Sequence, residues 1–187
     1  MLYIVSGFMR TGTSMMMQAL EAGGMEAVYS AKRNAEMNAR WGQPDYLPND
    51  NYYELDGEDY LRGDLEQRYE GKLVKCLWGG VLRLPPGDYR VVFMRRPAAE
   101  IRVSLLAFFG DDYAGRQFPD LDKAMDGIVE VLRDRKSFRA VDVVEYRDVL
   151  KNPGKVFSQL KSVGWPIDVM KAAAIPSRDK ARFSAHA

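Results

Sequence analysis

The sequence predicts an α/β fold: three layers, α/β/α, around a mostly parallel central sheet. Short apolar runs typical of buried strands alternate along the chain with longer segments of helical periodicity. The first run, Leu2 to Val5, leads through a loop bounded by glycines, Ser6 to Gly12, directly into a helical pattern. Another run, Tyr89 to Met94, is followed by Arg95-Arg96-Pro97, and proline is favoured in the first turn of a helix. These are the marks of strands that run into helices, as in βαβ units.

Length and composition indicate one globular domain over residues 1–187. The chain has 187 residues, of which 47% are hydrophobic and 28% charged, and its net charge is +1. A balanced charge argues against nucleic acid as a partner. No apolar run approaches the roughly 20 residues that span a bilayer, and we find no signal peptide. We therefore expect a cytoplasmic protein without a membrane span.

Cysteine and histidine are scarce, which limits the possible chemistry. Cys76 is the single cysteine, so an internal disulfide and a multi-cysteine metal site are excluded. The single histidine, His186, lies next to the end of the chain, which argues against a histidine base and a histidine-rich metal site. We expect no metal cofactor.

Elements of the first half follow from periodicity and turn residues. Apolar spacing predicts a helix over Thr13 to Ala22, ended by two glycines, and then a short strand within Met25 to Tyr29. Residues 30–55 are polar and rich in turn residues, so no long element is expected there, whereas Asp56 to Tyr69 has the spacing of an amphipathic helix. Because long irregular segments often cover binding sites, we interpret residues 30–71 as a substrate-covering insertion.

Aromatic side chains are frequent in the middle of this insertion and are open to two interpretations. They could form walls of a substrate pocket, or they could attach a surface excursion to the domain. The residues are Trp41, Tyr46, Tyr52 and Tyr53.

In the second half, β-branched and aromatic runs predict strands, and proline, asparagine and glycine mark the helix ends. The expected strands are Lys72 to Trp78, Tyr89 to Met94 and Val141 to Tyr146. The expected helices are Pro97 to Phe109, Asp120 to Ser137, and Pro153 to the stop at Gly164.

The loop after the first strand has the features of an anion site. Gly7 and Gly12 have the spacing of the ATPase pattern G-x-x-x-x-G-K-[ST], and Ser14 is in place, but Thr13 replaces the lysine. Arg10 supplies a positive charge within the loop, and a guanidinium makes forked hydrogen bonds to phosphate or sulfate. The pattern favours phosphate binding over an ordinary strand-to-helix turn.

A second basic position follows the strand Tyr89 to Met94. Arg96 ends this strand, and Ser104 lies about two helical turns later. Alone, an arginine at a helix start is more often a solvated group. The C-terminal ends of parallel strands meet at one edge, however, so we expect Arg96 and Arg10 to line the same site.

Five segments, in the same order, resemble the sulfotransferase family. R-T-G-T-S resembles the family's 5′-phosphosulfate loop, and VVFMRRPAAEIRVS resembles its 3′-phosphate motif. The other segments are NYYELD, KLVKCLWGGVLRLPPGDYRVVFMRRP and VVEYRDVLKNPGKVFSQLKSVGWPID. The chain is similar to a compact bacterial-type sulfotransferase, which implies a P-loop, sulfotransferase-like fold.

The resemblance implies the donor 3′-phosphoadenosine 5′-phosphosulfate and the product adenosine 3′,5′-bisphosphate. It assigns the 5′-phosphosulfate to the loop and the helix start, and the 3′-phosphate to Arg96 and Ser104. The loop residues are Gly7, Arg10, Thr11, Gly12, Thr13 and Ser14. A late basic loop of the family is loosely matched by Arg178, Lys180 or Arg182.

The resemblance also suggests catalytic residues for sulfuryl transfer to a hydroxyl or amine. Arg10 would stabilise charge on the transferred group. Lys75 aligns with the family's strand lysine, but Leu77 stands at the family's histidine base. Glu54 could replace that base, and a solvated or ion-paired glutamate is at least as good an interpretation.

Two other functions remain open. A P-loop kinase predicts ATP-magnesium binding and an aspartate after an apolar strand, where this chain has arginines. A non-catalytic nucleotide-binding module would explain the missing histidine. The sequence does not name the acceptor.

Overall fold

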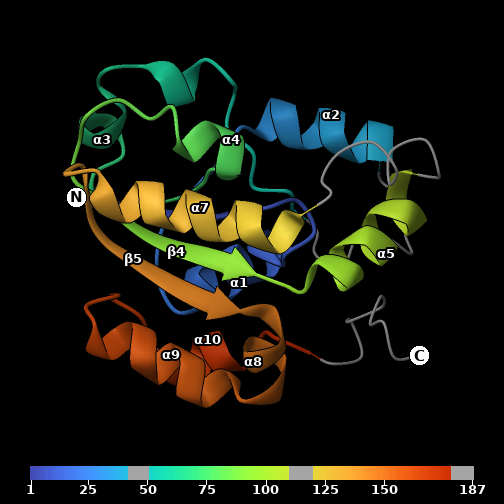
Figure 1. Ribbon diagram of the computed structural model, residues 1–187. Coiled ribbons are helices and arrows are strands. Elements are labelled where there is room, and N and C mark those ends of the chain that lie inside the picture. Colours follow the sequence, from blue (N-terminus) through green and yellow to red (C-terminus); the bar gives the residue numbers. More distant parts are fainter. Residues whose placement is uncertain (42–50, 110–119, 178–187) are drawn as a thin grey trace.

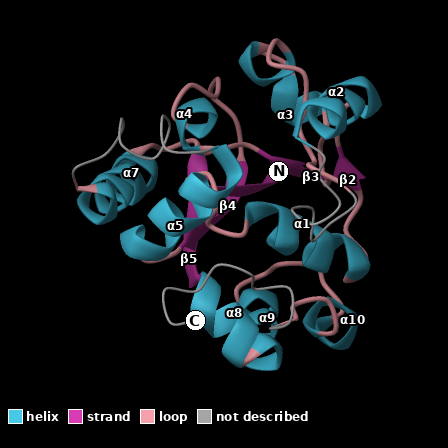
Figure 2. Cartoon of the chain, turned by 90° about the vertical axis from the view of Figure 1, so that its right-hand side faces the viewer, coloured by secondary structure: helices cyan, strands magenta, loops and turns pink. Residues whose placement is uncertain are grey.

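A five-stranded parallel sheet forms the centre of the structure, a computed structural model that describes residues 1–41, 51–109 and 120–177. The strand order is β2-β3-β1-β4-β5, and every neighbouring pair is parallel. The C-terminal ends of the strands therefore meet at one edge, which faces the viewer in Figure 2. The strands are β1 (Leu2–Gly7), β2 (Ala27–Val28), β3 (Leu73–Lys75), β4 (Tyr89–Arg95) and β5 (Phe138–Glu145).

Helices cover both faces of this sheet, which confirms the predicted three-layer α/β fold (Figure 1). One face packs against α1, α8, α9 and α10, and the other against α3, α4, α5 and α7. The first group is α1 (Thr13–Ala22), α8 (Tyr146–Lys151), α9 (Pro153–Ser162) and α10 (Val169–Ala173). The remaining elements are α2 (Ala31–Trp41), the 3₁₀ turn η1 (Asp59–Leu61), α3 (Leu65–Arg68), α4 (Trp78–Val81), α5 (Ala98–Phe109) and α7 (Leu121–Asp134).

Each side of the sheet has its own hydrophobic core because side chains alternate along a strand. In β1, Leu2 and Ile4 belong to the core under α5 and α7, whereas Tyr3 and Val5 belong to the core under α1 and α9. Every residue of β1 is buried, which explains why its sequence is apolar from Leu2 to Val5.

The segment after β2 differs from the prediction, because α2 occupies part of the stretch in which no long element was expected. Ser30 begins the helix: its carbonyl accepts from the Asn34 N–H at 2.9 Å, and its hydroxyl accepts from the Arg33 N–H at 3.1 Å. Most of the helix is exposed and its sequence contains few apolar residues, which is why this stretch did not predict a helix.

The predicted helix over Asp56 to Tyr69 was wrong. Only η1 and α3 form, separated by Arg62 in an extended conformation with ψ at 132°. Tyr60 is turned toward β3 instead, where its hydroxyl donates to the Lys75 carbonyl and accepts from the Leu55 N–H at 3.2 Å. A tertiary contact has outweighed local helix propensity.

The other predicted elements are confirmed, with shifted ends. β3 stops at Lys75 and Trp78 begins α4, so the apolar run that starts at Lys72 is only partly a strand. β5 starts at Phe138, three residues earlier than expected. These shifts are of the size usual for boundaries inferred from sequence.

A buried carboxylate joins the C-terminal ends of β4 and β5. Glu100, only 2% exposed, accepts from Arg96 Nε at 2.8 Å and from the Arg147 guanidinium. The Arg96 guanidinium also lies 4.4 Å from the centre of the Tyr146 ring. Burial alone raises the pKa of Glu100, but the hydrogen bonds from Arg96 and Arg147 outweigh it and hold this pKa below its ordinary value.

Replacing Gly7 with alanine is expected to lower the free energy of unfolding by about 2–4 kcal/mol. Gly7 has a φ of +147°, and an added Cβ would lie 2.6 Å from Thr11 Oγ1 and 2.7 Å from the Met94 carbonyl oxygen. The matched control is Gly127→Ala within α7, where a Cβ meets nothing within 4 Å. It should stabilise by about 0.5–1 kcal/mol. Urea denaturation measures both, and equal effects of the two substitutions would contradict this account of the loop.

Glu100→Gln is expected to lower the free energy of unfolding by about 2–4 kcal/mol at neutral pH, because two guanidinium groups lose a buried charged partner. The pKa of Glu100 is lowered in the folded state, so its stabilisation is complete above the unfolded-state pKa and is lost as the pH falls through the folded one. The gap between wild type and variant should therefore shrink from about pH 5 toward pH 3. The control is Glu36→Gln, in an exposed pair with Arg33, which should change stability by less than about 0.5 kcal/mol. A gap that is independent of pH would show that the Glu100 charge is not responsible.

Candidate functional site

The loop between β1 and α1 is held in a fixed shape by its own contacts. The Thr11 hydroxyl donates to the Phe8 carbonyl at 2.7 Å and closes the turn. Gly12 has a φ of +92°, and a Cβ there would lie 2.6 Å from the Tyr146 ring, so only glycine fits. Arg10 has a φ of 68°, which is unusual for a residue with a side chain. Such backbone conformations concentrate at functional sites.

The start of α1 is suited to an anion. The backbone N–H groups of the first turn have no acceptors within a helix, and the helix dipole makes this end positive. Gly12, at the N-cap position, has no side chain that could cap them. Thr13 is buried, and Ser14 is half-buried at the mouth of the loop.

Arg10, Arg96 and Ser104 come together in the structure from three different elements. Arg10 Nε donates to Ser104 Oγ of α5 at 2.9 Å. Arg96, just after β4, donates from Nη1 to the Arg10 carbonyl at 3.1 Å. Burial lowers the pKa of Arg10, and the nearby charge of Arg96 lowers it further. Two guanidinium groups in one partly buried region favour the binding of an anion.

These contacts join the two predicted anion sites into one arginine cluster, which consists of Arg10, Arg96, Arg147 and Glu100. Arg96 is buried and divides its donors between Glu100 and the Arg10 carbonyl. Ser104 is also buried, and it accepts from Arg10. In this conformation, both residues predicted for the 3′-phosphate are bonded within the protein.

The other flank of the loop is an ion pair at the end of β3. Lys75 Nζ lies 2.7 Å from Glu54 Oε1 and 3.4 Å from Ser14 Oγ, and it donates to the Tyr52 carbonyl. Burial lowers the pKa of Lys75, while the adjacent Glu54 carboxylate partly opposes this effect. The structure therefore places Lys75 and Glu54, two of the three predicted catalytic residues, beside the start of α1; the third, Arg10, lies in the loop itself.

Glu54 reaches this position because its segment is attached to the start of α2. The Glu54 carbonyl accepts from the Ser30 N–H at 2.9 Å, and the Tyr52 N–H donates to Asn34 Oδ1 at 2.7 Å. Residues 51–55 thereby lie across the C-terminal edge of β3, next to α1. The side chain of Glu54 is 22% exposed.

Three residues of the site were not predicted from the sequence, namely Glu100, Tyr146 and Arg147, and neither was the contact of Lys75 with the Tyr52 backbone carbonyl. Glu100 could have been found, because it follows Arg96 by four residues at the start of a helix, a spacing that brings such side chains together. Tyr146 and Arg147 begin α8, directly after β5, and no local pattern connects them with the loop. The pairing of Lys75 with the Tyr52 carbonyl depends on backbone position, which sequence patterns do not report.

Some predictions fall outside the described residues. Arg178, Lys180, Arg182 and His186 lie beyond residue 177, and Tyr46 lies between residues 41 and 51. Within the described ranges, no three or more His, Cys, Asp or Glu side chains are grouped so as to hold a metal ion. Over the same ranges, no helix combines the length and apolar character required to cross a bilayer.

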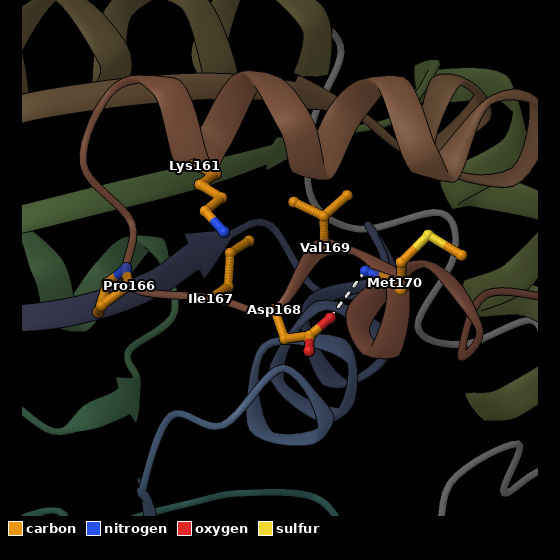
Figure 3. Close-up of a pocket in the computed structure, with 6 residues that line it drawn as sticks. All are labelled: Lys161, Pro166, Ile167, Asp168, Val169 and Met170. Atoms are coloured by element: carbon orange, nitrogen blue, oxygen red, sulfur yellow. Dashed lines mark hydrogen bonds between the residues drawn. The ribbon is translucent and has the colours of Figure 1, made fainter.

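A hollow of about 570 Å³ between α9 and α10 contains none of these site residues (Figure 3). The carboxylate of Asp168 already accepts from the Met170 and Lys171 N–H groups, at 2.9 and 3.1 Å, and so caps the short α10. The residues that line the hollow are Lys161, Pro166, Ile167, Asp168, Val169 and Met170.

Comparison with known proteins gives fold-level likenesses of low score. No protein-family model matches the chain, and no curated protein matches it. An unliganded sugar kinase structure from Janibacter sp. HTCC2649 is 13% identical, with a TM-score of 0.43, over 95% of this chain and 98% of that chain. The sulfotransferase STF1 from Mycobacterium tuberculosis H37Rv is 17% identical, with a TM-score of 0.37, over 96% of this chain and 69% of that chain. Neither likeness assigns an activity to this chain.

Proposed function

We propose that this protein transfers a sulfuryl group from 3′-phosphoadenosine 5′-phosphosulfate to a hydroxyl or amine acceptor. One observation carries the proposal: Arg10 of the loop contacts both Ser104 and Arg96, next to the uncapped start of α1. A donor with two anionic groups requires N–H donors at the helix start for one group and cationic side chains beside the loop for the other. The arginine cluster supplies them on the side of β4 and β5.

The residues present fit such a donor by their chemistry. The first N–H groups of α1 and the Arg10 guanidinium would bind the 5′-phosphosulfate, with Thr13 and Ser14 as hydroxyl donors. Arg96 and Ser104 would bind the 3′-phosphate after releasing part of their present hydrogen bonds. Glu100 would keep the Arg96 guanidinium oriented through Nε, and Nη1 would stay on the Arg10 carbonyl, while Nη2 turns to the ligand.

The β3 flank would perform the chemistry at the acceptor. When bound, the donor supplies the sulfuryl group, and a new bond from the acceptor oxygen or nitrogen to sulfur replaces the bond to the nucleotide. Arg10 and Lys75 would stabilise the charge that develops on the transferred and leaving oxygens. Glu54 would accept the acceptor proton, and Lys75, 2.7 Å away, would orient its carboxylate.

A second function, phosphoryl transfer from ATP, is favoured by one contact. Lys75 Nζ lies 3.4 Å from Ser14 Oγ, so a lysine from β3 stands at the mouth of a loop that lacks the usual lysine at position 13. Such a lysine could contact the terminal phosphates of a nucleoside triphosphate. Against it, β4 ends in Arg95 rather than in an aspartate that could bind magnesium.

Calorimetric titration with adenosine 3′,5′-bisphosphate and, separately, with ATP-magnesium tests the proposal. We expect micromolar or tighter binding of the bisphosphate and at least about tenfold weaker binding of ATP. Preference for ATP would favour the kinase function. Binding of the bisphosphate without any release of sulfate from the donor would favour a non-catalytic nucleotide-binding module. Binding of neither nucleotide would exclude all three functions.

Arg10→Ala is expected to slow sulfate release from the donor to water by about 100-fold or more, and to weaken bisphosphate binding by about tenfold or less. The reason is that Arg10 would contact the sulfuryl group, which the bisphosphate lacks. The control is Arg83→Ala, at an exposed arginine outside the site, which should alter neither quantity. Equal losses of rate and of bisphosphate affinity would show that Arg10 only anchors the nucleotide.

A further inference from the structure

The side-chain hydroxyl of Tyr52 takes part in none of the contacts described above. Its hydroxyl oxygen is shielded from solvent and has no hydrogen-bond partner among the described residues. Buried phenol groups are normally paired, because a hydroxyl removed from water without a partner is destabilising. A hydroxyl in this condition next to a binding loop would gain a partner if its ring turned toward a bound molecule.

The backbone of Tyr52 is fixed on both sides. Its N–H donates to Asn34 Oδ1 at 2.7 Å, and its carbonyl accepts from Lys75 Nζ. Lys75 in turn lies 3.4 Å from Ser14 Oγ, at the start of α1. The Tyr52 backbone is therefore linked to the ammonium group beside the start of α1.

The next residue, Tyr53, holds its own ring apart from the ring of Tyr52. Tyr53 adopts a left-handed conformation with a φ of 57°, which is unfavourable for a bulky residue. Its ring packs against Tyr29, and its hydroxyl donates to Glu21 Oε2 of α1 at 2.5 Å. Tyr53 therefore packs and hydrogen-bonds on the side of α1. These contacts fix the backbone of the segment that carries Tyr52 and Glu54.

Arg10 is the charged group that acts on the Tyr52 hydroxyl. Burial raises the pKa of Tyr52, and the positive charge of Arg10 opposes this rise. In the other direction, burial and Arg96 lower the pKa of Arg10, while Tyr52 opposes the decrease. Arg10 comes from the loop itself and Tyr52 from the segment attached to Lys75 of β3, and each group influences the pKa of the other.

We propose that the Tyr52 hydroxyl donates a hydrogen bond to the group that is transferred, between Arg10 and Lys75. The inference rests on the proposed function, since it takes the loop to hold that group. A neutral phenol adds a directed donor without adding charge. The hydrogen bond from this phenol would strengthen as negative charge develops on the oxygens of the transferred group.

Tyr52 would also connect the two flanks of the site. Its carbonyl holds Lys75, and Lys75 holds Glu54 at 2.7 Å. A transferred group bonded to the Tyr52 hydroxyl would therefore be positioned relative to the same lysine that orients the proposed base.

Tyr52→Phe tests the role of the hydroxyl. The variant should release sulfate from the donor about 10–100-fold more slowly, while its affinity for adenosine 3′,5′-bisphosphate stays within about twofold of wild type. The control Tyr29→Phe, at an exposed tyrosine that packs on Tyr53, should leave both unchanged. A loss of bisphosphate affinity as large as the loss of rate would overturn the inference.

A second measurement uses the unaltered protein and does not depend on activity. With tyrosine labelled by ¹³C at Cζ, the Tyr52 signal is identified by its disappearance in Tyr52→Phe. We expect it to shift on addition of 3′-phosphoadenosine 5′-phosphosulfate or of inorganic sulfate, and not with the bisphosphate alone. A signal that stays fixed with saturating donor, or with inorganic sulfate at the highest soluble concentration, would overturn the inference. A shift with ATP-magnesium but not with the sulfated nucleotide would support the contact and reject sulfuryl transfer.

Discussion

The hydrogen bond from Arg96 to the Arg10 carbonyl is the contact on which the rest of the site depends. Arg10 occupies a left-handed conformation that a residue with a side chain rarely adopts, so its peptide must be held from outside the loop. Arg96 can do this because Glu100 fixes it through Nε and the Tyr146 ring covers its guanidinium. The direction of the Arg10 side chain, toward Ser104, follows from this chain of contacts rather than from the loop alone.

The site that results is asymmetric, and the asymmetry follows from the strand order. Because β1 lies between β3 and β4, the loop that follows it is flanked on one side by the end of β3 and on the other by the end of β4. The β4 side carries the arginine cluster, whereas the β3 side carries a Lys75–Glu54 ion pair. Under the proposed function, the first side would attract the anionic donor, and the second, where a carboxylate lies near the helix start, would take the acceptor proton.

Buried charge is concentrated at this edge of the sheet. Lys75, Arg96 and Glu100 are each less than 10% exposed, although such residues are rarely buried unless paired. Each has a charged partner close by: Glu54 for Lys75, and Glu100 for Arg96. A buried ion pair is weak support for stability by itself, since desolvation offsets most of the Coulombic attraction. Its retention at a loop of unusual backbone conformation is better explained by the orientation it imposes on the functional groups.

The sequence by itself determined the strands and the loop, because both depend on local chemistry. The apolar runs of β1 and β4 can be recognised because strands of a parallel sheet are buried on both faces. The loop can be recognised because Gly7, Gly12 and Ser14 have the spacing of a phosphate-binding loop, with Arg10 as the charge within it. Local patterns failed at α2, whose face is mostly exposed, and at Asp56 to Tyr69, where the contact of Tyr60 with β3 outweighed helix propensity. Only the tertiary structure decided that Arg10 contacts Ser104, that Lys75 contacts Glu54, and that Glu100 joins Arg96 to Arg147. These partners are mostly distant in the chain, and their meeting depends on strand order and on side-chain direction, which hydrophobic periodicity does not encode.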